Sequence, residues 1–421
     1  MPFDLIITGG HVVDPASGID AIRDVAVDGD RIAAVEPAIP RESATRVIDA
    51  KDRLVTPGLI DMHTHVFWGA NHGGIDADSI AWRSGVTTWI DAGSAGAYSI
   101  PALHEYVAKR AEARIKAFIN ISYLGLVGLN YDEYCNPLAC NVELLARVAD
   151  QSRDFVVGIK ARMGEEGFCY PGLEPLRRAV RASEITGLRV MCHLSGLPPP
   201  VRDVLALLRA GDIVTHSFTG AGEKLVDGRG GILPEVLRAR DAGILFDVGH
   251  GAGSFSFESA EALAGHAFWP DTLSTDLHQG SMPGPNLVED QENVHRVRGD
   301  GSPHFTLLTV MTKFLYLGLP IDQLIRAVTS RPAELIGMSG EIGTLRPGST
   351  ADIAILEIER GSHELYDIYG QTRSFDRQFR SVLTLRGGRE MTQKPVPPPP
   401  PWVRLVDLEG TSATAAATRG R

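Results

Sequence analysis

Hydrophobic and polar residues alternate along the two ends of the chain in a way that predicts β-structure. Residues 4–15, 23–37 and 45–58 form alternating or apolar runs bounded by Gly, Pro and Asp, and residues 343–359 repeat that texture near the C-terminus. Short runs of this kind are typical of β-strands separated by turns. We therefore expect both chain ends to contribute strands to one small β-sandwich domain, with the middle of the chain inserted between them.

The middle of the chain has a different pattern, in which short apolar runs alternate with amphipathic stretches such as 102–113, 173–186 and 201–211. This pattern is typical of parallel strands joined by crossover helices. The eight candidate strands are residues 58–65, 87–93, 116–125, 155–162, 188–195, 212–218, 243–250 and 272–278. Eight such units predict an α/β fold, a TIM-like (β/α)8 barrel, although an open doubly wound sheet has the same local pattern.

These patterns divide the chain into four expected segments. Residues 1–56 form the N-terminal part of the small β domain, 57–344 the barrel, and 345–393 the C-terminal part of the small domain. Residues 394–421 begin with a proline run and continue with small polar residues, which indicates an extended or disordered arm.

Composition narrows the classes of partner and compartment. The net charge of -11 provides no basic field for nucleic acid, and no stretch approaches the length of a transmembrane helix. The N-terminus lacks the basic flank and long apolar region of a signal peptide, and four cysteines without a CxxC pair make no disulfide framework. We expect a cytoplasmic protein, a homo-oligomer, that acts on a small molecule and binds neither nucleic acid nor membrane.

Polar residues stand at the ends of the predicted barrel strands, where the active site of such a barrel forms. They are His63 and His65 on the first strand, Lys160 on the fourth, His193 on the fifth, His216 on the sixth and Asp276 on the eighth. Residues i and i+2 of a strand point to the same side, so the first two histidines can bind one ion together. An HxH pair alone can also be two hydrogen-bonded histidines, but the later ligand-type residues favour a metal site.

The ordered motifs resemble those of the amidohydrolase superfamily. They are PGLIDMHTH, the lysine in GIKAR, the histidines in MCHLS and VTHSF, the late STDLH and the closing GTLRPGSTADIAIL. Within the superfamily the chain is similar to the dihydroorotase-like and deacetylase-like branch, whose members carry two divalent metals bridged by a carbamylated lysine.

That resemblance implies a role for each strand-end residue. His63, His65 and Asp276 would hold the more buried metal, and His193 and His216 the other. Lys160, carbamylated by CO2, would bridge the two ions together with a hydroxide. We expect Zn²⁺, although these ligand types accept other divalent metals.

The chemistry of Lys160 and Asp276 leads to the same assignment. Two cations would repel a protonated ammonium, whereas a neutral amine that has added CO2 is an anionic bridge. A lysine paired with a carboxylate, or a one-metal enzyme with free Lys160, are the alternatives. Asp276 is expected to accept the hydroxide proton and pass it to the leaving atom, unless it serves as a ligand alone.

The substrate side of the site is less distinctive. No arginine follows His65 in VFWGANHGG, whereas dihydroorotase-like enzymes usually bind the substrate carboxylate there. Arg162 is the alternative carboxylate-binding residue, unless it pairs with an acid in residues 164–167. Tyr98, His250 and His278 are candidates for substrate contact or for support of the ligands.

The function predicted from these residues is metal-dependent hydrolysis of an amide or ester bond in a small acylated carboxylate, as in a deacetylase or esterase. A cyclic amidase of the dihydroorotase or hydantoinase type is the alternative, and the missing arginine counts against it. A non-catalytic homologue would typically have lost ligands, whereas this chain keeps the full set.

Overall fold

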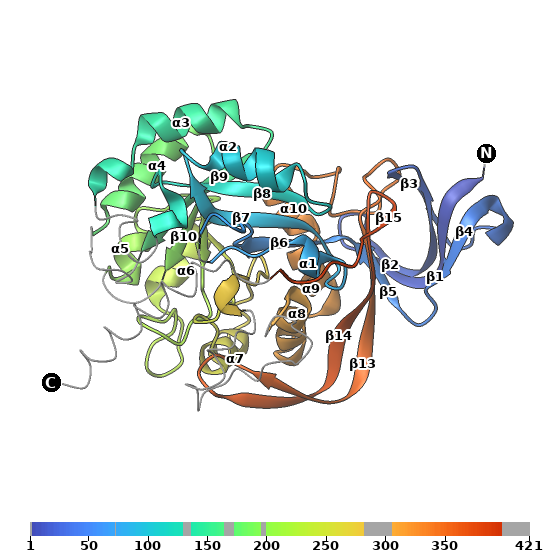
Figure 1. Cartoon of the computed structure of the whole chain (residues 1–421). Helices are drawn as coiled ribbons and strands as arrows, with labels where there is room; N and C mark the ends of the chain where they lie inside the picture. The colour runs from blue at the N-terminus through green and yellow to red at the C-terminus, as the bar shows by residue number, and fades with distance from the viewer. Residues whose placement is uncertain are drawn as a thin grey trace.

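A computed structural model describes residues 2–71, 73–128, 136–163, 172–194, 199–281 and 305–397. Two sheets organise this part of the chain, one at the centre of a helix-covered barrel and one at the side of it (Figure 1). The barrel sheet comes from the middle of the chain, and the other sheet comes from both ends, as the sequence predicts.

Parallel strands form the barrel, and they pair in chain order. They are β6 (Leu59–Thr64), β7 (Val86–Gly96), β8 (Arg114–Asn120), β9 (Val156–Met163), β10 (Val190–Leu194), β11 (Ile213–Thr215) and β12 (Leu245–Phe246). The predicted eighth strand, 272–278, lies between the two edges of this sheet. Parallel bridges join Asp247 to Thr272 on one side and Thr64 to Leu277 on the other. The sheet therefore closes, which confirms the TIM-like barrel and excludes an open doubly wound sheet.

Helices cover the outside of the barrel and bury their apolar faces against it. They are α1 (Asp78–Ala81), α2 (Ile100–Ala102), the π-helical η2 (Leu103–Ala108), α3 (Val142–Gln151), α4 (Glu174–Thr186), α5 (Val201–Leu205), α6 (Pro234–Asp241), α7 (Phe257–Gly265), α8 (Leu307–Tyr316), α9 (Ile321–Val328) and α10 (Ser330–Leu335). Short 3₁₀ turns are η1 (Arg41–Ser43), η3 (Gly125–Gly128), η4 (Pro137–Ala139) and η5 (Gln279–Ser281).

Two of the predicted helical stretches differ in how much of their length is helical in the structure. The stretch 173–186 is confirmed as α4. The stretch 201–211 is helical only as far as Leu205, because the chain then turns and the Arg209 backbone N–H donates to the Asp212 carboxylate at 2.9 Å. This turn leads directly into β11, so the shorter helix sets the position of a barrel strand.

The second sheet joins the two ends of the chain into one mixed, eight-stranded sheet. Its strands are β1 (Phe3–Asp14), β2 (Ile19–Asp28), β3 (Arg31–Glu36), β4 (Ala44–Asp49), β5 (Leu54–Pro57), β13 (Ile353–Tyr366), β14 (Thr372–Arg386) and β15 (Arg389–Glu390). The predicted sandwich strands thus form one hydrogen-bonded sheet around a shared core that includes Leu5, Val25 and Ile353. Gly58 links this sheet to the barrel at a point where a Cβ would lie 2.3 Å from Thr87 Oγ1.

The two strands of the β13–β14 hairpin extend beyond the other strands of their sheet and continue along the barrel towards α7 (Figure 1). At its tip, Asp367 Oδ2 accepts a hydrogen bond from Phe257 N at 3.0 Å. The Tyr369 hydroxyl donates to Gly253 O at 3.1 Å. The C-terminal hairpin therefore supports the loop that follows β12 at the mouth of the barrel.

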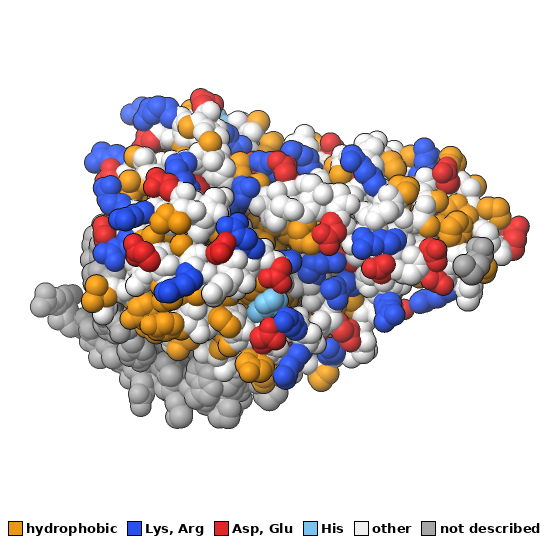
Figure 2. All heavy atoms as spheres, turned by 90° about the horizontal axis from the view of Figure 1, so that it is seen from above, with side chains coloured by type: hydrophobic (Ala, Val, Ile, Leu, Met, Phe, Trp, Pro, Cys, Tyr) orange, Lys and Arg blue, Asp and Glu red, His pale blue; other side chains and the backbone are white. Residues whose placement is uncertain are grey.

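The surface of the described part carries both signs of charge. Acidic and basic side chains are interspersed on the face shown in Figure 2, with small groups of hydrophobic side chains between them. Within the described residues, no helix has the length and apolar character needed to cross a membrane.

Candidate metal centre and active site

The six ligand-type residues predicted from the sequence converge at the carboxyl-terminal end of the barrel. Their side chains come from β6 and the residue after it, from β9, from β10, from the residue after β11, and from the closing segment 272–278. All six residues are buried, and none exposes more than 9% of its surface. Burial of unpartnered polar groups is costly. Such a cluster therefore indicates that the six side chains share a bound group of opposite charge.

The first ligand set surrounds one oxygen of Asp276. The Nε2 atoms of His63 and His65 lie 3.3 Å and 3.1 Å from Asp276 Oδ1. Ligand atoms about 2.0–2.2 Å from a tetrahedral Zn²⁺ have similar mutual separations. Both separations therefore match those of ligands that share one ion.

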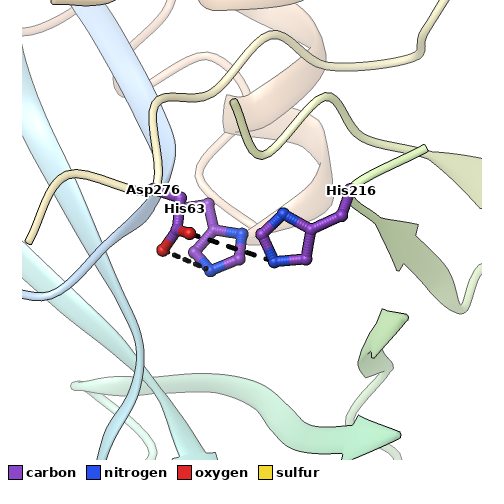
Figure 3. Close-up of side chains that lie close together, drawn as sticks. All are labelled: His63, His216 and Asp276. Atoms are coloured by element: carbon purple, nitrogen blue, oxygen red, sulfur yellow. Dashed lines mark ion pairs between the residues drawn. The ribbon is translucent and has the colours of Figure 1, made fainter. Parts of the chain in front are cut away.

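The second ligand set faces the other oxygen of the same carboxylate. His216 Nε2 lies 2.7 Å from His193 Nδ1 and 4.0 Å from Asp276 Oδ2. Figure 3 shows the imidazoles of His63 and His216 turned towards the Asp276 carboxylate, and one ligand atom from each lies within 4.8 Å of the others. Asp276 thus stands between two histidine sets, with one oxygen towards each.

Lys160 lies at the first set, although it comes from another strand. Its Nζ is 2.9 Å from His63 Nε2. Burial lowers the pKa of the Lys160 amine to about 8, against the opposing influence of Asp276. A substantial neutral fraction near that pH is the form that reacts with CO2. Gly93 makes room for the lysine, because a Cβ there would lie 2.5 Å from Lys160 Cβ.

Outer contacts leave the Nε2 atoms of three histidines directed at the centre. The Nδ1 atoms of His63 and His65 lie 2.9 Å and 2.8 Å from the hydroxyls of Thr215 and Ser94. His216 Nδ1 donates to Gly249 O at 2.6 Å. Contacts of this kind orient metal-binding imidazoles.

The electrostatics of the site also favour metal binding. Burial lowers the pKa values of His63, His193 and His216, so these imidazoles stay neutral, as ligands must be. Neutral imidazoles around an ionised carboxylate suit a divalent cation.

Two ligands adopt left-handed backbone conformations, with φ of 66° at His216 and 51° at Asp276. Such values are uncommon for residues other than glycine and concentrate at functional sites. Gly251 permits the close approach at Asp276, because a Cβ there would lie 2.8 Å from Asp276 Oδ2. The backbone is therefore shaped to present these two side chains.

The predicted substrate contacts fall at different distances from the centre. Arg162 lies on β9 opposite His193. Burial is the main cause of the lowered pKa values of His193 and Lys160, and the positive charge of Arg162 is a smaller cause. The acids of 164–167, its alternative partners, lie outside the described residues. The His278 ring centre is 6.4 Å from that of His65. Arg162 and His278 are thus near the ligands.

His250 and Tyr98 take other positions. His250 is buried, donates from Nδ1 to Gly251 O at 2.9 Å and accepts from Lys313 Nζ at 2.6 Å. These contacts favour a supporting role. Tyr98 is 66% exposed, and its ring centre lies 4.6 Å from that of Tyr123, with the two rings tilted against each other.

Reasoning from the sequence missed the residues behind the ligands, above all Thr215, Ser94 and Asp247. Asp247 is fully buried and accepts hydrogen bonds from the hydroxyls of Thr215, Thr272 and Ser274. The available signal was a carboxylate at the end of the apolar run GILFDVGH, where an uncompensated charge is costly.

Comparisons with known proteins agree with this geometry. A deacetylase from Agrobacterium fabrum is 31% identical over 367 residues, covering 86% of this chain and 85% of the relative. A deacetylase from Enterococcus faecalis is 31% identical over 393 residues, covering 92% and 99%. Among crystal structures, an adenine deaminase has 30% identity and a TM-score of 0.81, and a dihydroorotase has 26% and 0.79. Each of the two structural matches covers 92% of this chain and 99% of the other.

The sequence model of the amidohydrolase family matches residues 54–389, which include the barrel and all six ligand-type residues. The chain is therefore a metal-binding hydrolase of the amidohydrolase family.

Proposed function

We propose that this protein hydrolyses the amide or ester bond of a small acylated carboxylate, as a deacetylase or esterase, with two divalent metal ions. The observation that carries the proposal is the position of Asp276, whose two oxygens face separate histidine sets. The deacetylases that share 31% of their sequence over most of this chain support the same reaction class.

The residues divide into two metal-binding sets and a bridge. His63, His65 and Asp276 would hold one ion, and His193 and His216 the other. Lys160, as a carbamate, would connect them, which its burial and its contact with His63 support. When bound, two such ions, with Zn²⁺ as the expected metal, activate a water molecule and polarise the substrate carbonyl.

The chain's own groups then handle the proton and the substrate. Asp276 accepts the proton released by the attacking water and delivers it to the departing nitrogen or oxygen. Arg162 binds the substrate carboxylate through its planar fork of donors. The ligand-type side chains themselves are shielded from bulk solvent, since each of them is buried.

Cyclic amides are the second candidate substrates, because a dihydroorotase structure resembles this chain at 26% identity. The absence of arginine in the VFWGANHGG run after His65 favours the acyclic substrates. The ligands themselves serve amide and ester bonds equally.

A rate screen with metal-loaded enzyme tests the proposal. The panel pairs the two enantiomers of N-acyl amino acids and O-acyl hydroxy acids with cyclic ureides and with adenine, the last because of the adenine deaminase structure. Acyclic acyl carboxylates should give the highest kcat/KM, and elemental analysis should find two ions per chain. A preference for cyclic ureides or adenine would reject the acyclic class, and one ion or none would reject the two-metal centre.

A further inference from the structure

We infer that one buried carboxylate, Asp247, orients a histidine in each of the two ligand sets and is thereby a positioning residue for both metals. The inference rests on the proposed two-metal function and adds residues that lie outside both ligand sets. Asp247 follows β12, has no exposed surface, and accepts hydrogen bonds from three hydroxyl groups. Two of those hydroxyls lead to metal ligands.

The first path runs through Thr215 to His63. The Thr215 hydroxyl donates to Asp247 Oδ2 at 2.7 Å, which uses its single proton. Its oxygen is 2.9 Å from His63 Nδ1 and can then only accept from that atom. His63 is thereby held in the Nδ1–H tautomer, with the Nε2 lone pair directed at the first metal set. The direct separation of His63 Nδ1 from Asp247 Oδ2 is 3.8 Å, so Thr215 is the necessary link.

The second path runs through Ser274 and the Gly249 peptide to His216. The Ser274 hydroxyl donates to Asp247 Oδ2 at 2.7 Å and accepts from Gly249 N at 2.9 Å. The carbonyl of Gly249 accepts from His216 Nδ1 at 2.6 Å. This arrangement fixes the same tautomer in His216 and directs its Nε2 towards the second set.

The two paths pass close to each other at Gly249, which leaves no space for a side chain. A Cβ there would lie 2.2 Å from Thr215 Oγ1 and 2.9 Å from His216 Nδ1. The third hydroxyl on Asp247, that of Thr272, donates to Oδ1 at 2.6 Å and is not on either path to a histidine. Thr272 therefore provides an internal control with the same chemistry.

Release of metal into a graded series of chelator concentrations, followed by elemental analysis, tests the inference without any substrate. The wild-type protein should release its ions in two steps, and His65→Ala and His193→Ala identify which step belongs to which set. Thr215→Val should weaken the His65 step and Ser274→Ala the His193 step, each by about 10–100-fold, the usual effect of removing such a contact. Thr215→Ser should restore the wild-type step.

Thr272→Val decides between orientation and simple stability. Valine replaces threonine with almost the same shape, so Thr272→Val removes a donor from Asp247 but leaves both paths intact. Equal weakening by Thr215→Val, Ser274→Ala and Thr272→Val, with two steps in the wild type, would overturn the inference and leave the two-metal centre standing. Fewer than two ions per chain in the wild type would instead overturn the proposed centre.

Asp247→Asn provides an independent variant if Thr215→Val does not fold. In this variant the amide NH2 would donate to a hydroxyl that donates to Asp247 in the wild type. The Thr215 hydroxyl would then turn its proton towards His63 Nδ1. Weakening of both steps supports the inference, and unchanged release of both ions rejects it.

Discussion

The Nζ atom of Lys160 lies 2.9 Å from Nε2 of His63, although two strands separate β9 from β6 in the barrel sheet. Only the curvature of a closed barrel brings these side chains together. An ammonium at this distance would compete with a cation for the same imidazole, whereas a carbamate would join the cation as a ligand. The contact therefore ties metal binding to the chemical state of the lysine.

Lys160→Ala should remove the bridge, lower the bound metal to one ion or fewer, and reduce kcat/KM by at least about 10²-fold, because activation of the water depends on both ions. Short carboxylic acids should restore part of the activity by occupying the vacated position. The measurement is kcat/KM with and without added acetate or propionate, with the wild-type enzyme under the same acids as control. Full activity in the variant would remove the carbamate from the mechanism.

The convergence of the ligand-type residues was predictable because two simple rules cover their positions. Hydrophobic periodicity locates the strands, and parallel topology brings the carboxyl ends of the strands to one face. These rules place His63, His65, Lys160, His193 and His216 without knowledge of any distance. The predicted closing strand was also located correctly, although only bridges at Thr272 and Leu277 attach it to its neighbours.

The supporting residues were not predictable from the same rules. The role of Asp247 depends on the closing segment, which brings Thr272 and Ser274 to it from a distant part of the sequence. Nor does a pattern of residue types reveal the left-handed backbone at Asp276. Tyr98 is exposed and lies beside Tyr123, which a strand-end position does not specify.

Arg162→Met should lower kcat/KM for carboxylate substrates by about 10²-fold, because a buried charge-assisted hydrogen bond is lost. A neutral ester of the same acyl compound should suffer far less. Arg153→Met is the matched control, since Arg153 is exposed and precedes β9 at the opposite end of the barrel. Equal losses on charged and neutral substrates would mean that Arg162 supports the fold instead.

Lys313 provides a prediction about stability, away from the metal ligands. It lies on α8, is buried beside Phe255 and Phe257, and donates to His250 and to Tyr366 O. Burial lowers its pKa from 10.5 to about 7, with a smaller opposing effect of Asp367. Between these two pH values the unfolded chain binds more protons at this position than the folded chain, so stability must rise with pH.

The measurement is the free energy of unfolding of metal-loaded wild type and Lys313→Met at several pH values from 7 to 10. As the pH rises, the free energy of unfolding of the wild type should increase relative to that of the variant by up to about 1.4 kcal/mol per pH unit, the limit for one proton. The same substitution at the exposed Lys51 is the control. A constant difference between wild type and Lys313→Met would show that Lys313 stays protonated in the folded protein.

Asp276 is the residue for which metal binding and proton transfer can be separated. Its Oδ1 atom faces His63 and His65, whereas Oδ2 lies 4.0 Å from His216. Asp276→Asn keeps an oxygen that can coordinate weakly but cannot carry a proton. We expect the variant to retain metal, as measured by elemental analysis, and to lose several orders of magnitude, about 10³-fold or more, in kcat.

A series of leaving groups then distinguishes the two roles of the carboxylate. Amides and alkyl esters need a proton at the departing atom, whereas activated aryl esters leave without one. If Asp276 delivers that proton, Asp276→Asn should lose most activity on amides and recover relatively more on activated esters, so that kcat/KM depends more steeply on the leaving-group pKa than in the wild type. A weakened metal site alone would slow every member of the series by a similar factor. Equal losses across the series, with both ions still bound, would therefore assign Asp276 to coordination and place the delivery of the proton on another group.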